Sequence, residues 1–135
     1  MITAVDANVL IDLSVEDPSR AKPAVEALEA CASEGRLVVC EIVLAEFARG
    51  FPEGLDPAEW VRGAGIDYDP IQEETAVEAG RMQRRYESRI DRTARRLIAD
   101  LLVGAHALLQ ADRLLTRDRG FYRDYFRGLK VIEPA

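Results

Sequence analysis

The sequence predicts an α/β protein in which a parallel sheet of about five strands is covered by helices on both faces. Short apolar runs of strand length recur along the chain, and longer segments with helical spacing of apolar residues separate them. Hydrophobic residues make up 48% of the chain and charged residues 31%, which excludes a disordered or membrane-like composition. The length of 135 residues favours one domain, residues 1–135.

The first half of the chain is expected to alternate strands and helices. The elements are, in order, a strand at Ile2–Val5, a helical turn at Asn8–Leu13, a helix at Pro23–Ser33, a strand at Leu37–Cys40 and a helix at Ile42–Arg49. Pro18 ends the helical turn. Proline favours the first turn of a helix, so the longer helix is expected to begin at Pro23. Gly35 and Gly50 then end the two helices.

The second half repeats this alternation. Phe51–Gly65 is rich in proline and glycine and is expected to be a broken connection with some helical character. The elements that follow are a strand at Ile66–Asp69, a long helix at Gln72–Ser88, a helix at Ala94–Ala111 capped by Thr93, a strand at Arg113–Leu115 and a strand at Gly128–Ile132. Gly104 weakens the helix that contains it, so we expect close packing against this glycine.

Apolar strands that alternate with helices form parallel sheets, and right-handed crossovers bring the carboxyl ends of all strands to one edge. Ligands bind at that edge, near the point where the strand order reverses. Asp6 follows the first predicted strand and Asp118 follows the fourth. We therefore expect both carboxylates at this edge of the sheet.

Four acids in mostly apolar surroundings are the candidate functional residues: Asp6, Glu46, Asp100 and Asp118. Ionised carboxylates beside a core are costly unless they are paired or bind a metal, so four from distant segments suggest a shared cation. Three of them also have a simpler interpretation. Asp6 can cap a helix, Glu46 can be a surface residue paired with Arg49, and Asp118 can stabilise a turn before a glycine. Oxygen-only ligands select Mg²⁺ or Mn²⁺ rather than zinc.

The other candidate residues are expected to be structural. The acids interpreted as solvated surface or turn residues are Asp12, Asp17, Glu41, Asp112 and Asp124. His106 is a lone histidine within an apolar helix and is expected to be a hydrogen-bonded core residue. Cys31 and Cys40 are expected to be reduced, partly buried thiols, because no second pair completes a metal site.

The net charge of −6 is unevenly distributed. Residues 1–78 hold 17 acids and 5 bases, whereas residues 79–135 hold 7 acids and 13 bases, including an arginine-rich stretch from Arg81 to Arg96. This asymmetry fits a nucleic-acid surface or internal charge pairing, and it does not distinguish them. The sequence shows neither a secretory signal nor a membrane-spanning run, so a cytoplasmic location is expected.

The order and spacing of four motifs resemble the PIN-domain ribonucleases, and among them the VapC-type toxins of bacterial toxin–antitoxin pairs. The motifs are Asp6-Ala7-Asn8-Val9-Leu10-Ile11, Val43-Leu44-Ala45-Glu46-Phe47, Ile98-Ala99-Asp100 and Leu115-Thr116-Arg117-Asp118-Arg119-Gly120-Phe121. The resemblance covers nearly the whole chain. It implies that Asp6, Glu46, Asp100 and Asp118 form an acidic tetrad and that Asn8 and Thr116 line the site. Cys40-Glu41 departs from the small hydroxyl residue of many members, which puts a helix cap in doubt.

This resemblance implies a metal-dependent endoribonuclease that leaves a 5′-phosphate and a 3′-hydroxyl. Asp6 and Asp118 are the expected direct ligands of Mg²⁺, for which Mn²⁺ can substitute, and Glu46 and Asp100 are expected to bind a second metal or to orient the attacking water. Arg117 and Arg119 flank Asp118 and are candidates for RNA contact. The expected protein partners are a small VapB-type antitoxin and a second copy of the chain.

Two other functions compete with this one. A receiver domain also carries acids at the edge of a parallel sheet, but it needs an acceptor Asp after the third strand and a Lys after the fifth. Asp67-Tyr68-Asp69-Pro70 fits the first requirement poorly, and Lys130 lies within the last predicted strand. The main alternative is a catalytically silent PIN-like module that binds RNA or a protein partner, and the complete set of four acids argues against it.

Overall fold

The structure, a computed structural model, describes residues 1–86 and 97–135. Its centre is an all-parallel sheet, as the sequence predicted, made of β1 (Ile2–Val5), β2 (Arg36–Val39), β3 (Ile66–Tyr68), β4 (Arg113–Leu115) and β5 (Val131–Ile132). The strand order is β3-β2-β1-β4-β5. The chain moves outward from β1 in one direction and returns on its other side at β4, so the strand order reverses between β1 and β4.

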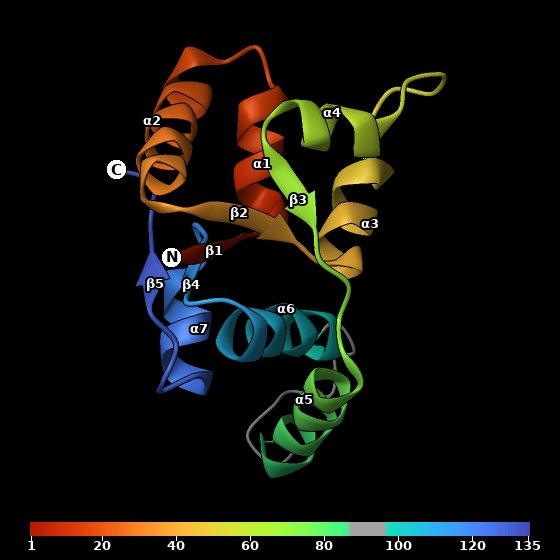
Figure 1. The fold of residues 1–135 in the computed structure, drawn as a ribbon, viewed down its shortest axis with the longest axis vertical. Helices are drawn as coiled ribbons and strands as arrows, with labels where there is room; N and C mark the ends of the chain where they lie inside the picture. The colour runs from red at the N-terminus through yellow and green to blue at the C-terminus, as the bar shows by residue number, and fades with distance from the viewer. Residues whose placement is uncertain (87–96) are drawn as a thin grey trace.

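Helices cover both faces of this sheet (Figure 1). The helices are α1 (Ala7–Ser14), α2 (Pro18–Glu34), α3 (Glu41–Arg49), α4 (Pro57–Gly63), α5 (Glu73–Tyr86), α6 (Leu97–Gln110) and α7 (Arg119–Tyr125). Figure 1 shows α1 to α4 on one side and α5 to α7 on the other. No helix in the described part of the chain is long and apolar enough to cross a membrane.

Two helices differ from the sequence prediction. Helix α2 begins at Pro18 rather than Pro23, because Asp17 caps it by accepting the backbone N–H of Ser19 at 3.0 Å. Pro23 lies inside the helix, which continues despite the missing N–H. Helix α7 was not predicted, since Gly120 in its first turn favoured a simple turn. The predicted cap Thr93 lies outside the described residues.

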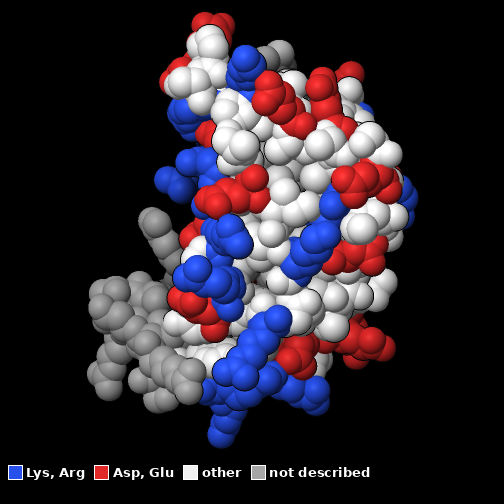
Figure 2. Space-filling view, turned by 90° about the vertical axis from the view of Figure 1, so that its left-hand side faces the viewer, with Lys and Arg blue, Asp and Glu red and all other residues white. Residues whose placement is uncertain are grey.

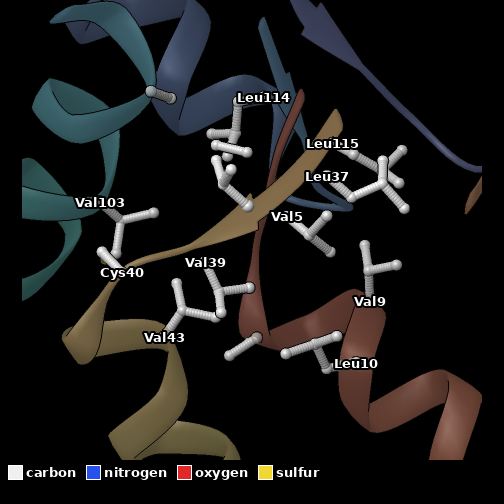
Figure 3. Close-up of a cluster of buried hydrophobic side chains, with 14 of the residues drawn as sticks. Val5, Val9, Leu10, Leu37, Val39, Cys40, Val43, Val103, Leu114 and Leu115 are labelled. Carbon is white, nitrogen blue, oxygen red and sulfur yellow. The ribbon is translucent and has the colours of Figure 1, made fainter. Parts of the chain in front are cut away.

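The core packs strand side chains against helices from both sides (Figure 3). Val39 of the sheet lies beside Val43 of α3, Val5 lies toward Val9 of α1, and Leu114 lies toward α6 and α7. Cys31 and Cys40 are free thiols, as expected, and both are buried. Cys40 occupies the cap position of α3, and the helix begins there although a hydroxyl is missing.

Gly104 confirms the expected close approach in α6. The glycine is buried, and a Cβ at this position would overlap the ring of Phe126. Phe126 is itself 2% exposed and follows α7 directly. The contact therefore fixes α6, which carries Asp100, against the end of α7, which Asp118 precedes.

Candidate functional site

The point where the strand order reverses holds a polar network centred on Asp6. Asp6 is only 7% exposed and caps α1, with Oδ1 accepting the N–H of Ala7 at 2.7 Å. Its Oδ2 accepts the hydroxyl of Thr116 at 2.8 Å and the side-chain amide of Asn8 at 3.4 Å. The strands β1 and β4, which both end at this point, are parallel neighbours. The Asp6 carboxylate therefore joins the first turn of α1 to the turn that follows β4.

The turn that carries Asp118 is held against α1 by further hydrogen bonds. The backbone N–H of Asp118 donates to Oγ1 of Thr116 at 3.0 Å, and the N–H of Arg117 donates to Oδ1 of Asn8 at 3.1 Å. The amide of Asn8 also donates to Oγ1 of Thr116 at 3.2 Å. Asp118 itself is exposed, directly before α7. Asn8 and Thr116 thus determine where the Asp118 backbone lies.

Helices α3 and α6 supply the other two acids. Glu46 lies on α3 and Asp100 on α6. Partial burial raises the pKa of the Glu46 carboxyl above its ordinary value, and the negative charges of Asp6 and Asp100 raise it further. Glu46 is exposed as a whole residue, so burial affects only part of the side chain. The contributions of these two charges place the Glu46 carboxyl near Asp6 and Asp100.

Tyr122 of α7 lies among all four acids, and sequence reasoning missed it. Its side chain is 2% exposed, and burial is the main reason that its pKa is raised above the ordinary value. The charges of Asp6, Asp100, Asp118 and Glu46 add to this rise in that order. The Tyr122 hydroxyl donates a hydrogen bond to Asp6. Tyr122 follows Asp118 by four residues, one helical turn, a spacing that becomes informative only once α7 is recognised.

The mutual repulsion of these four acids favours a bound cation. Burial is the main cause of the raised pKa of Asp6, and the nearby charge of Asp118 adds to it. Hydrogen bonds from Thr116 and Ala7 oppose this rise. Among the described residues, no three acidic, histidine or cysteine side chains are already arranged as a metal site. The four acids offer only carboxylate oxygens, the ligand type that Mg²⁺ and Mn²⁺ prefer.

Asp12 contradicts the expectation of a solvated acid. It is 3% exposed, and its Oδ1 accepts Nε and Nη2 of Arg20 at 3.0 and 2.8 Å. Its Oδ2 pairs with Nε of Arg117 at 2.6 Å. Asp12 lies one helical turn after Asn8 and so faces the turn after β4, a neighbour that the local sequence does not reveal.

Of the remaining acids that were expected to be solvated, three are exposed and Glu41 is not. Glu41 is partly buried, rather than solvated, and accepts the N–H of Ile71 at 2.8 Å. Asp112 is exposed and accepts the N–H of Ile2 at 2.6 Å, and Asp17 caps α2. Asp124 is exposed beside Arg123.

His106 is a buried, hydrogen-bonded core residue, as the sequence suggested. Its side chain is 2% exposed, and its Nε2 lies 3.0 Å from Oδ2 of Asp69. Nε2 of Gln110, one helical turn further along α6, donates to the same oxygen at 3.2 Å. These contacts fix α6 to the segment that follows β3.

The basic residues are distributed over several surfaces. Arg119 is exposed at the start of α7. Arg85 pairs with Glu78 at 2.6 Å, in keeping with internal charge pairing on α5. The other end of the Arg81–Arg96 stretch lies outside the described residues. Figure 2 shows a face on which both signs are interspersed, with Lys and Arg gathered at its lower end.

Comparison with known proteins identifies the family. A search of curated protein sequences finds no match. Among solved structures, VapBC2 from Rickettsia felis, bound to a promoter DNA fragment, matches with a TM-score of 0.70 and 18% identity over 98% of both chains. DNA-bound VapBC from Salmonella typhimurium matches with a TM-score of 0.71 and 15% identity, covering 100% of this chain and 99% of the other.

A third solved structure is the sarcin–ricin loop cleaving toxin VapC20 of Mycobacterium tuberculosis. It matches with a TM-score of 0.63 and 15% identity, covering 95% of this chain and 98% of the other. At these identities the structural matches establish a shared fold. The sequence model of the PIN domain matches residues 3–126, nearly the whole chain. The chain therefore belongs to the PIN domain family.

Proposed function

We propose that the protein is a metal-dependent endoribonuclease, the toxin of a toxin–antitoxin pair, and that residues 1–135 act as one nuclease domain. What supports this proposal is that four carboxylates, from α3, α6 and the ends of β1 and β4, all raise the pKa of the buried Tyr122. A cluster of carboxylates that concentrates negative charge in this way has no evident structural benefit, since the charges repel. It resembles a site whose function needs a cation and costs stability.

In this proposal Asp6 and Asp118 bind Mg²⁺ or Mn²⁺ directly. A bound divalent ion supplies an activated water and offsets negative charge on the leaving oxygen. The hydroxyls of Thr116 and Tyr122 orient the Asp6 carboxylate through hydrogen bonds, so this carboxylate needs little reorganisation to bind the ion. Glu46, with its raised pKa, is suited to accept a proton from the attacking water, and Asp100 orients that water or holds a second ion.

The RNA contacts and protein partners form the second part of the proposal. Arg117 and Arg119 are exposed on both sides of Asp118 and can contact backbone phosphates. The solved VapBC complexes support a VapB-type antitoxin partner for this chain. We expect the antitoxin to place an Arg or Lys among the four acids, where charge-assisted pairs are strong. A homodimer and a cytoplasmic location complete this proposal.

The test is RNA cleavage by purified protein. A labelled structured RNA should be cut with Mg²⁺ or Mn²⁺, and EDTA should stop the reaction. Asp6→Asn and Asp118→Asn should each abolish cutting while circular dichroism shows a retained fold. Asp124→Asn is the matched control, because Asp124 is an exposed acid on α7 beside Arg123. Undiminished cleavage by the two site variants would refute the nuclease proposal, and RNA binding without any cleavage would favour the silent module.

A further inference from the structure

The polar face of α1 holds the Asp118 turn at two points one helical turn apart. Asn8 accepts the backbone N–H of Arg117 at 3.1 Å, and Asp12 pairs with the Nε of the same residue at 2.6 Å. Residues four apart lie above one another on a helix, so both contacts come from one side of α1. The backbone and the side chain of Arg117 are therefore both fixed relative to Asp6, which caps this helix.

The burial of Asp12 explains why its ion pair with Arg117 restricts the arginine side chain. The Asp12 side chain is 4% exposed, whereas those of Arg20 and Arg117 are 44% and 50% exposed. A buried carboxylate requires partners, and Asp12 obtains them from both arginines, one on each oxygen. Two cations share one anion, so the cluster of Arg20, Asp12 and Arg117 carries a net positive charge at the same helix that Asp6 caps.

We propose that Asp12 is a positioning residue that aims Arg117 at an RNA phosphate next to the bond to be cut. This inference rests on the proposed ribonuclease function. Asp12 occupies the Nε of Arg117, and the guanidinium keeps two amino groups on its outer edge for a phosphate. A fixed arginine loses less side-chain freedom on binding RNA than a mobile one. The contact between Arg117 and the phosphate also offsets the repulsion between RNA and the four acids.

Binding of RNA in EDTA tests this proposal without cleavage. The probe is a short fluorescein-labelled single-stranded RNA, and fluorescence anisotropy is measured over a range of salt concentrations. Arg117→Gln should weaken RNA binding about tenfold. The negative slope of log K against log salt concentration should become shallower by about 0.7, as expected for one lost phosphate contact. Asp12→Asn should give a similar loss. The double variant should bind no more weakly than Arg117→Gln alone, because Asp12 acts through Arg117.

The matched control is the exposed pair of Arg36 and Asp67, joined at 3.2 Å. Arg36 begins β2 and so lies at the opposite edge of the sheet from Asp6. Arg36→Gln and Asp67→Asn make the same charge changes and should leave binding unchanged. The proposal is overturned if Asp12→Asn binds like wild type, if its effect persists in full in the Arg117→Gln background, or if the control pair has an equal effect.

Steady-state cleavage separates positioning from loss of fold. Asp12→Asn should raise KM about tenfold and change kcat less than about twofold, because it loses a contact rather than a reacting group. Arg117→Lys should not restore binding, since one ammonium cannot serve Asp12 and a phosphate together. Cleavage that survives Asp6→Asn would refute the ribonuclease proposal, whereas intact RNA binding by Asp12→Asn would refute only the role of Asp12.

Discussion

Replacing Glu46 by Gln should stabilise the protein when no divalent metal is present. The pKa of the Glu46 carboxyl is raised mainly by partial burial and further by the negative charges of Asp6 and Asp100, which repel it. Gln keeps the size and the helix propensity of Glu and removes the charge. Because Glu46 is largely exposed, water screens each repulsion to about 0.5 kcal/mol, so the two charges together account for about 1 kcal/mol.

Thermal unfolding in EDTA at low ionic strength measures this difference. A gain of about 1 kcal/mol should raise the Tm of Glu46→Gln by about 3 °C in a protein of this size. Saturating Mn²⁺ should narrow or reverse the difference, because metal bound only to the folded state stabilises the wild type more. Glu29→Gln, an exposed glutamate on α2, is the control for the change in net charge. A lower Tm for Glu46→Gln in EDTA, or shifts equal to those of the control, would refute the reasoning.

Three further predictions concern the surroundings of the four acids. The stability advantage of Glu46→Gln in EDTA should shrink as the pH falls from 7 towards 4.5, because the wild-type carboxyl has a raised folded-state pKa and becomes protonated. Urea titrations measure the free energy of unfolding at each pH, and an advantage independent of pH would contradict this. Tyr122→Phe should lower the free energy of unfolding by about 1 kcal/mol and reduce cleavage, through the lost hydrogen bond to Asp6; wild-type values in both assays would exclude this role. Gly104→Ala should destabilise the protein by about 1–3 kcal/mol, because the added methyl group overlaps the ring of Phe126. Gly80→Ala has open space around it and should stabilise α5 by up to about 1 kcal/mol. Equal Tm shifts for the two variants would contradict the close contact between Gly104 and Phe126.

The sheet could be predicted from the sequence because its strands are nearly continuous apolar runs. The bounds of β1 and β4 match the prediction, and the positions of Asp6 and Asp118 at one edge follow from parallel topology alone. Helix α2 was placed less well, since two prolines compete for its start and only the cap by Asp17 decides between them.

The four acids could be proposed from sequence, but their surroundings could not. Tyr122 was missed because its place among the acids depends on α7, a short helix that begins with a glycine in its first turn. Asp12 was misread because its partners Arg20 and Arg117 are 8 and 105 residues away along the chain. Local patterns report the face of a helix, and only the tertiary structure reports what that face contacts.

The location of a bound metal tests the central claim most directly. Crystals of the full chain soaked in Mn²⁺ should show an anomalous scattering peak in contact with carboxylate oxygens of Asp6 and Asp118, with Glu46 and Asp100 facing the same ion or its water. Crystals of Asp6→Asn and Asp118→Asn should lack this peak or show it much weakened. A wild-type protein with no peak in the pocket, or with its strongest peak on other residues, would contradict the claim that these acids form one metal site.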